Sequence, residues 1–243
     1  MREPRIYIDD TLKHGLELTL PEQASQHISK VLRMKVGQQL WLFNGEGGCY
    51  LSKITAIKKR AVDVEIESFK DEIRESTLRI TLVQAVSRSQ HMDYTIQKAV
   101  ELGVVAIVPV RTEFCNVRFD KLTYAKKLLH WQGIIVSACE QCGRNKVPDI
   151  SEPVTLSAYL AMQVQGLKLF LHPGVDKRLR SFNKAEEEIS LLSGPEGGFS
   201  SQEIEQVVAG DYHAVDLGPR VLRTETAAIA AISACQALWG DMG

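Results

Sequence analysis

The chain has 243 residues, of which 44% are hydrophobic and 24% charged, and its formal net charge is −1. A chain of this size and composition folds without a metal or a disulfide framework, so its five widely spaced cysteines are expected to be free thiols. No apolar run approaches the ~20 residues that span a bilayer, and the first residues lack an apolar signal region. We therefore expect a cytoplasmic protein without a membrane span. A net charge near zero neither supports nor excludes a nucleic-acid partner, which would need a local basic surface.

Residues 1–72 are predicted to form a small β-barrel. Alternating apolar and polar residues, or short apolar runs between turn residues, predict strands over residues 5–8, 16–20, 39–43, 49–57 and 61–66. One helix is expected over residues 21–34, because apolar residues recur at helical spacing after Pro21, which suits a first turn. The charged segment 69–76 is the expected linker to the next region.

Beyond this linker, strands alternate with helices. The strands are expected over residues 78–86, 104–110, 167–171, 189–192 and 213–217, and the helices over residues 92–102, 122–142, 201–209 and 225–239. Gly143 is expected to end the long helix. The alternation predicts an α/β domain with a mostly parallel sheet and helices on both faces.

Ligands of such sheets bind beyond the carboxyl ends of the strands, and three strand ends here carry unusual loops, at residues 171–174, 194–199 and 217–226. In the second loop, Gly194, Gly197 and Gly198 allow the backbone to approach a ligand closely and to expose N–H donors. Ser200 and Glu203 then match a capping box that begins a helix. The loop lacks the Lys-Ser/Thr ending of a phosphate-binding P-loop, and by itself it is equally compatible with a plain tight turn.

The third loop places Arg220 and Arg223 just before the last helix, where the helix dipole disfavours cations. An ion pair with Glu225 is the structural explanation for such an arginine. The alternative is that the arginines serve a ligand or a substrate.

Two of these loops also carry a family signature. Gly-Pro-Glu-Gly-Gly at residues 194–198 and Leu-Gly-x-Arg-x-Leu-Arg-x-Glu-Thr-Ala at residues 217–227 resemble the RsmE family of 16S rRNA uridine-N3 methyltransferases, which belongs to the SPOUT, or α/β-knot, class. The resemblance includes residues 31–33, 97–103 and 138–144, so it covers essentially the whole chain.

One motif departs from the family. Relatives often have Ser-Glu-Arg after the second strand of the α/β domain, where this chain has Thr112-Glu113-Phe114. If that arginine contacts RNA in relatives, its role is in doubt here or passes to Arg111 or Arg118.

The resemblance implies a PUA-like RNA-binding barrel over residues 1–72 and, over residues 73–243, a SPOUT domain with a trefoil knot that binds S-adenosylmethionine. It also implies a homodimer with its active site near the subunit interface, which suits the alanine-rich last helix, and it implies 16S rRNA or the small ribosomal subunit as substrate, with no metal. One of the residues that the resemblance places near the cofactor, His172, has a structural alternative, since a histidine before Pro173 at a strand end is also typical of a turn. The residues that the resemblance places around the cofactor, largely through backbone groups, are Leu171, His172, Pro173, Gly194, Pro195, Glu196, Gly197, Gly198, Leu217, Gly218, Leu222 and Thr226.

RNA contacts need cationic side chains against the phosphates. The residues that we predict to bind RNA are Arg5, His27, Arg33 and Lys35 in the first region and Arg144 after the long helix. A cation at a helix end, such as Arg33, is also explained by the helix dipole alone.

Methylation at N3 of a uracil requires loss of the N3 proton, which leaves the base negatively charged. We hypothesise that Arg223 or Arg220 stabilises this charge, as donors do in an oxyanion hole. Glu225 would either orient the arginine or relay the proton.

Two other functions are compatible with the sequence. One is a non-catalytic RNA-binding protein that uses its second domain only to dimerise, and the other is a nucleotide-dependent α/β enzyme whose glycine-rich loop holds phosphate. Cys139 and Cys142 also raise the question of zinc or redox chemistry. A structural zinc site needs four ligands, and no second pair with suitable spacing exists in the sequence. A thioredoxin-like pair begins a helix, whereas Cys139 and Cys142 end one. We therefore predict that these thiols pack in the interior.

Overall fold

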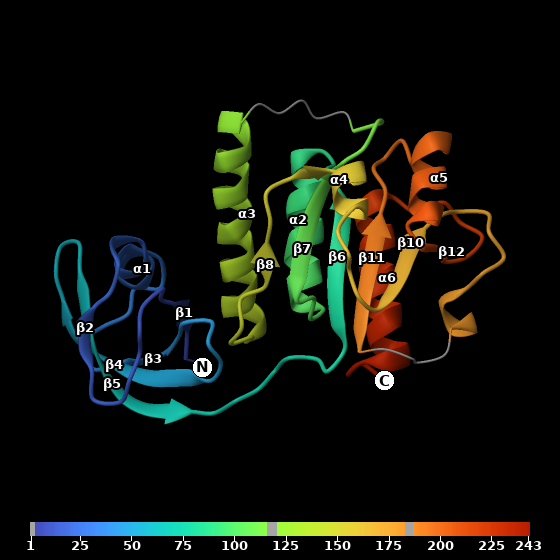
Figure 1. Ribbon diagram of the computed structural model, residues 1–243. Helices are drawn as coiled ribbons and strands as arrows, with labels where there is room; N and C mark the ends of the chain where they lie inside the picture. The colour runs from blue at the N-terminus through green and yellow to red at the C-terminus, as the bar shows by residue number, and fades with distance from the viewer. Residues whose placement is uncertain (1–2, 116–120, 183–186) are drawn as a thin grey trace. The chain divides into compact units, whose positions relative to one another are not determined.

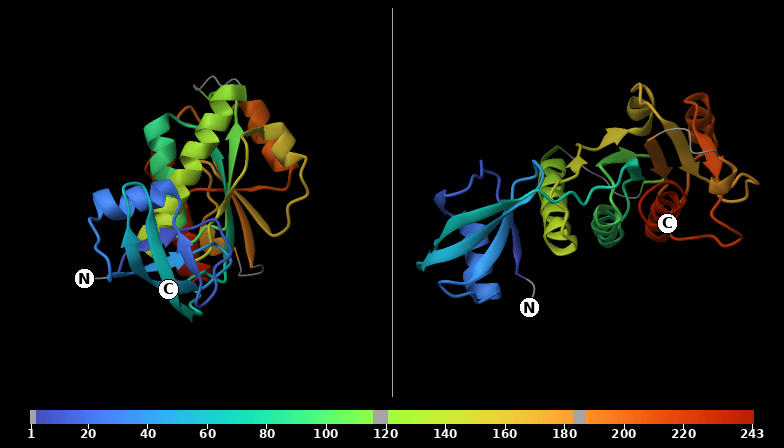
Figure 2. Two further views of the ribbon diagram at one scale, coloured as in Figure 1. Left: turned by 90° about the vertical axis from the view of Figure 1, so that its left-hand side faces the viewer. Right: turned by 90° about the horizontal axis from the view of Figure 1, so that it is seen from below.

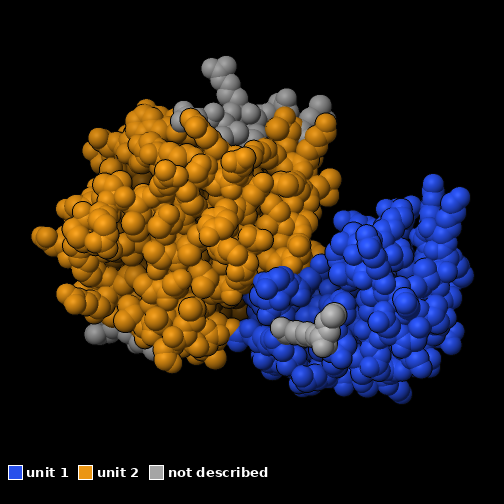
Figure 3. Space-filling model, turned by 180° about the vertical axis from the view of Figure 1, so that it is seen from behind, with its two compact units in different colours: residues 1–75, 139–147 blue, residues 76–138, 148–243 orange. Residues whose placement is uncertain are grey.

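The computed structural model describes residues 3–115, 121–182 and 187–243. The chain divides into two compact units, one of residues 1–75 and 139–147 and the other of residues 76–138 and 148–243, which Figure 3 colours separately. The boundary after residue 75 lies close to the one expected at residue 72. The membership of residues 139–147 in the first unit was not expected from the order of the elements.

The first unit is built on the five strands that the sequence predicts. They are β1 (Arg5–Tyr7), β2 (Glu17–Thr19), β3 (Gln39–Phe43), β4 (Cys49–Ile57) and β5 (Val62–Lys70), in the sheet order β1-β3-β4-β5-β2 (Figure 1). β1 pairs in parallel with β3, and the other pairs are antiparallel. Alternate residues of these strands, such as Leu40, Leu42 and Val64, are fully buried and form one core with Ile28 of the helical segment.

The helical segment of the first unit is shorter than predicted. α1 (Glu22–Gln26) continues into a π-helical turn at His27–Val31, and the helix does not reach residue 34, because Arg33 takes a left-handed backbone conformation with a φ of 52°. The expected linker also begins later than predicted. Phe69 belongs to β5 and packs against Tyr50 of β4, with the ring centroids 4.9 Å apart.

The second unit has the parallel sheet that the alternating pattern predicts. Its strands are β6 (Arg79–Ala85), β7 (Ala106–Arg111), β8 (Asp149–Ile150), β9 (Val154–Thr155), β10 (Leu167–Leu171), β11 (Glu188–Ser193) and β12 (His213–Val215). The order is β12-β10-β11-β6-β7-β8, β9 also pairs with β7, and each of these pairings is parallel. β8 and β9 were not predicted, because strands of two residues show no periodicity.

Helices cover both faces of this sheet, as expected. α2 (Ser89–Glu101), α3 (Lys121–Cys142) and α6 (Thr224–Trp239) lie on one face, and α4 (Leu156–Leu160) and α5 (Ser201–Ala209) on the other, while a 3-10 turn lies at Leu179–Ser181 (Figure 2). The predicted capping box is present: the Glu203 backbone N–H donates to Ser200 Oγ (3.3 Å), and the Ser200 backbone N–H donates to Glu203 Oε2 (3.0 Å). α4 was missed because it is short. The hydroxyl of Thr155 caps it by accepting from the Ala158 N–H.

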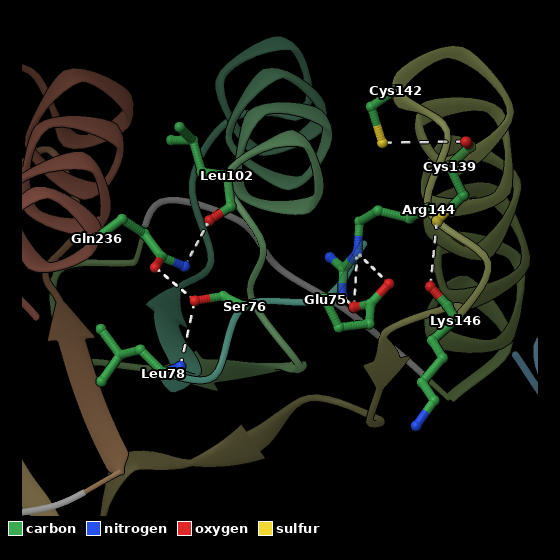
Figure 4. Close-up of polar contacts among 9 residues, drawn as sticks. All are labelled: Glu75, Ser76, Leu78, Leu102, Cys139, Cys142, Arg144, Lys146 and Gln236. Atoms are coloured by element: carbon green, nitrogen blue, oxygen red, sulfur yellow. Dashed lines mark hydrogen bonds and ion pairs between the residues drawn. The ribbon is translucent and has the colours of Figure 1, made fainter. Parts of the chain in front are cut away.

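The alanine-rich helix α6 is packed within its own unit. Ala228 and Ala231 are fully buried, and the fully buried Gln236 donates through Nε2 to the carbonyl oxygen of Leu102, at the end of α2 (3.0 Å). The same side chain accepts from Ser76 Oγ (2.8 Å), just before β6 (Figure 4). The small residues of α6 therefore allow close packing on α2, and they are not by themselves evidence for a subunit interface.

Candidate functional site

The three loops singled out in the sequence meet at one cavity of about 590 Å³. They follow β10, β11 and β12, which are neighbours in the sheet. Of the residues expected around the cofactor, Gly218 and Thr226 do not line the cavity. Those that line it are Leu171, His172, Pro173, Gly194, Pro195, Glu196, Gly197, Gly198, Leu217 and Leu222.

The glycine-rich loop is held in a fixed shape against the start of α6. Gly198 has a φ of +72° and its N–H donates to the carbonyl oxygen of Pro195 (3.0 Å), which closes a turn. Thr224 Oγ1 donates to the carbonyl oxygen of Gly194 (2.6 Å) and accepts from Gln84 Nε2 (3.1 Å). A Cβ added at Gly197 would lie only 2.9 Å from the Cβ of Phe114. The loop is therefore more than a plain turn, because close neighbours on several elements fix its backbone.

Asp216 organises the other two loops, and sequence reasoning missed it. Its carboxylate accepts from the N–H of Gly218 (2.9 Å) and of Gly174 (3.1 Å) and lies 2.8 Å from an Nη atom of Arg178. Burial alone would raise the pKa of Asp216, but the hydrogen bonds from Gly218 and Gly174 and the Arg178 guanidinium together lower it below its usual value. The available signal was an aspartate directly before a glycine at a strand end, which is typical of a turn that bonds its own backbone.

Both predicted catalytic arginines line the cavity, and the expected ion pair with Glu225 is not formed. Arg220 and Arg223 are exposed, and neither has an acidic partner among the described residues. Glu225 Oε2 instead lies 2.9 Å from Nδ1 of His91, in an ion-pair contact that lacks hydrogen-bond geometry. In this structure Glu225 therefore contacts His91 rather than an arginine, and His91, from the first turn of α2, is a further cavity residue that the sequence did not reveal.

The cavity also contains a polar atom that is left without a partner. The hydroxyl of Ser193, at the end of β11, is buried and has no hydrogen-bond partner within the described ranges, although Ser193 lines the cavity. Buried polar groups are nearly always paired, so this hydroxyl is suited to a ligand that brings its own donor or acceptor.

The residues predicted to bind RNA fall into two groups. His27, Arg33 and Lys35 are exposed, and Val31 and Val36 beside them are exposed as well. This part of the first unit thus presents cationic and apolar side chains together.

Arg5 and Arg144 are buried instead. Arg5 bonds Asn145 Oδ1 and lies over the ring of Phe43, 5.2 Å from its centroid, whereas Arg144 donates to both carboxylate oxygens of Glu75, with Nε 3.0 Å from Oε2 (Figure 4). Because their guanidinium groups are used inside the first unit, a structural role replaces the predicted RNA contact for these two arginines. Arg111 is exposed at the end of β7, and Arg118 lies outside the described residues.

The cysteine pair is a packing element. The Cys139 thiol is buried and lies 3.7 Å from the Lys146 carbonyl oxygen, and Cys142 Sγ lies 3.9 Å from the Cys139 carbonyl oxygen (Figure 4). Burial raises the pKa of Cys139 to about 12, so the reactive thiolate is disfavoured.

Among the residues that the structure describes, no group of three or more histidine, cysteine or acidic side chains is arranged to hold a metal ion. None of the helices in this part of the chain has both the length and the apolar character needed to cross a membrane.

Comparisons with known proteins match both units. A family model described as an RNA methyltransferase PUA domain matches residues 20–67, and one described as an RNA methyltransferase domain matches residues 74–236. The ribosomal RNA small subunit methyltransferase E of Buchnera aphidicola subsp. Schizaphis graminum is 37% identical over 99% of this chain and 98% of its own length.

Two solved structures are also similar over their full length. A putative methyltransferase from Legionella pneumophila, in complex with the bound cofactor SAM, has 44% sequence identity and a TM-score of 0.97, covering 99% of this chain and 100% of its own. A ribosomal RNA small subunit methyltransferase E from Neisseria gonorrhoeae, bound to S-adenosyl methionine, has 40% identity and a TM-score of 0.95, covering 100% of both chains. The similarity therefore includes the SPOUT-like fold and the loops around the cavity.

Proposed function

Because this chain belongs to the ribosomal RNA small subunit methyltransferase E family, we propose that it methylates N3 of a specific uridine in 16S rRNA with S-adenosylmethionine. The observation that carries the proposal is that the glycine-rich loop and the double-arginine loop form one cavity. Its partner is then the small ribosomal subunit, and the enzyme acts in the cytoplasm. We also propose a homodimer on the basis of the family resemblance.

The residues of the cavity fit this cofactor. A volume of about 590 Å³ lies within the range of small-molecule sites, and apolar residues such as Leu171 and Leu222 line it together with glycines and arginines. The unpartnered hydroxyl of Ser193 offers a hydrogen bond to a polar group of the ligand. When bound, S-adenosylmethionine supplies an electrophilic methyl group on a sulfonium centre.

The contribution of the protein is alignment and charge stabilisation. The fixed loops hold the reactants in line, and such positioning supplies on the order of 7–11 kcal/mol of barrier reduction. Arg223 and Arg220 are the cations of the cavity that can face the negative charge on the uracil as its N3 proton leaves. Glu225, with His91 beside it, lines the same cavity and is the group that we propose to take this proton.

Calorimetry and nucleoside mapping test the proposed function. S-adenosylmethionine is expected to bind saturably, and 16S rRNA from a strain without this gene is expected to lack a 3-methyluridine that the purified protein restores. No binding, with RNA affinity intact, would instead identify an RNA-binding protein. A preference for ATP or NAD would identify a nucleotide-dependent enzyme.

Asp216→Asn is expected to weaken the binding of S-adenosylmethionine about tenfold, because the variant loses the charge that the two glycine N–H groups and Arg178 stabilise. The pKa of Asp216 is lowered in the folded protein. The contribution of this carboxylate to the stability of the folded protein is therefore complete above the ordinary carboxyl pKa of about 4 and is lost as the pH falls through the lowered pKa. Calorimetry at neutral pH measures the affinity for S-adenosylmethionine. Asp176→Asn, an exposed change in the loop after β10 that also carries Gly174 and Arg178, is the matched control, and equal affinities of the two variants would contradict the role of Asp216.

A further inference from the structure

Phe114 lies at the edge of the cofactor cavity because of the strand order. β11, β6 and β7 are adjacent and parallel, so the segments that follow them emerge side by side at one edge of the sheet. The glycine-rich loop follows β11, and the turn at Thr112–Cys115 follows β7. The side chain of Phe114 lies directly against Gly197, where an added Cβ would meet the Cβ of Phe114 at 2.9 Å.

The turn that carries this ring is well anchored. The Glu113 N–H donates to Glu203 Oε1 (2.8 Å), and Glu203 is itself buried and caps α5. The Cys115 N–H donates to the carbonyl oxygen of Thr112 (3.2 Å), and the thiol of Cys115 donates to the carbonyl oxygen of Val86 (3.0 Å). The turn is thus bonded to two other segments, through the Glu113 backbone to Glu203 and through the Cys115 side chain to Val86.

The ring is nevertheless left open to solvent. Phe114 is 43% exposed, and a single exposed apolar residue is common on protein surfaces, so exposure alone means little. What distinguishes this residue is that an anchored turn presents an aromatic ring against a loop of the cofactor cavity.

Two arginines belong to segments next to this turn. Arg111 is exposed at the end of β7, with its guanidinium carbon 5.9 Å from the centroid of the Tyr124 ring. Arg88, which follows β6, is exposed as well, and its backbone N–H donates to Glu196 Oε1 of the glycine-rich loop (3.3 Å). An exposed aromatic ring with nearby arginines is the combination that binds unpaired nucleotides, because bases stack on aromatic rings while cations contact the phosphates.

We propose that Phe114 stacks on a base of the rRNA substrate next to the methylated uridine, with Arg88 and Arg111 at the adjoining phosphates. This inference rests on the proposed function and adds a substrate-positioning residue to it. It also accounts for the departure from the family motif at this position: an arginine plane and a phenylalanine ring both stack on bases, so the exchange replaces one stacking surface by another.

Kinetics on small ribosomal subunits from a strain without this gene test the proposal. Phe114→Ala is expected to raise the KM for subunits by roughly 5- to 100-fold, as loss of one base–aromatic stack predicts, with kcat and the Kd for S-adenosylmethionine nearly unchanged. Phe114→Trp is expected to keep a KM near that of the unaltered protein, and its added emission is expected to be quenched when subunits bind. Phe114→Leu, which keeps an apolar side chain without a π-face, is expected to behave like Phe114→Ala. Tyr94→Ala, at an exposed aromatic on α2 outside the cavity, controls for loss of any exposed ring.

The outcomes separate this proposal from the proposed function. If the unaltered protein does not methylate subunits, the proposed function fails before any variant is compared. If it is active and Phe114→Leu keeps the original KM, the ring is only an apolar cover and stacking is overturned. A weaker Kd for S-adenosylmethionine in Phe114→Ala without RNA also overturns the proposal, because it makes the ring part of the cofactor site.

Discussion

Arg223→Ala is expected to lower kcat on small ribosomal subunits by about 100- to 1,000-fold, the usual effect of removing one preorganised donor from a developing charge. Arg223 is the N-cap residue of α6, and the next residue, Thr224, is bonded to the glycine-rich loop (2.6 Å). Its backbone is therefore fixed relative to the cofactor cavity. Single-turnover kinetics with saturating S-adenosylmethionine measure the loss.

Three further variants make this test specific. Arg220→Ala is expected to have a smaller effect, because Arg220 lies in the middle of the loop beside Val221, which is 85% exposed. Arg180→Ala removes an exposed arginine outside the cavity and is expected to leave kcat unchanged. Arg223→Lys keeps the charge but not the planar donor fork, so it is expected to recover only part of the rate. Undiminished turnover of Arg223→Ala, with cofactor affinity intact, would refute the assignment.

Arg144→Ala is expected to destabilise the first unit by about 3–5 kcal/mol, because it leaves the carboxylate of Glu75 largely buried without its partner. The side chains of Arg144 and Glu75 are 5% and 15% exposed, so solvent replaces little of the lost interaction. Hydrogen exchange read on peptides from β1 to β5 is the appropriate measurement, because it reports the stability of this unit separately from the second one.

The replacement of both partners is the matched control. The double variant Arg144→Met/Glu75→Leu is expected to recover most of the lost stability, since a buried ion pair is often replaced by apolar residues at little cost. If Arg144 were an RNA contact, Arg144→Ala would keep the exchange protection of the first unit and lose only RNA affinity. That result would restore the role predicted from the sequence.

Much of the fold follows from local patterns in the sequence. The period of the apolar residues predicts the five strands of the first unit and the parallel α/β order of the second, and the Ser200–Glu203 spacing predicts the start of α5. Errors arise where local patterns carry little information. The helix after Pro21 ends early because Arg33 adopts a left-handed conformation, and α4, β8 and β9 are too short to show a period.

The site was predictable in its loops but not in its contacts. Glycines and arginines at neighbouring strand ends, read with the family resemblance, predict the cavity walls. The pairing of His91 with Glu225, and the burial of Arg144 against Glu75, join residues that are distant in the chain, so no local pattern indicates them. The knot, the homodimer and the individual catalytic roles stay predictions.

The division of the chain has a consequence for biosynthesis. Domains generally fold in order of emergence during translation, but the first unit here includes residues 139–147. The guanidinium of Arg5 bonds Asn145, and the carboxylate of Glu75 pairs with Arg144. The amino-terminal unit therefore leaves the ribosome incomplete and acquires its last contacts only after more than half of the polypeptide has been synthesised.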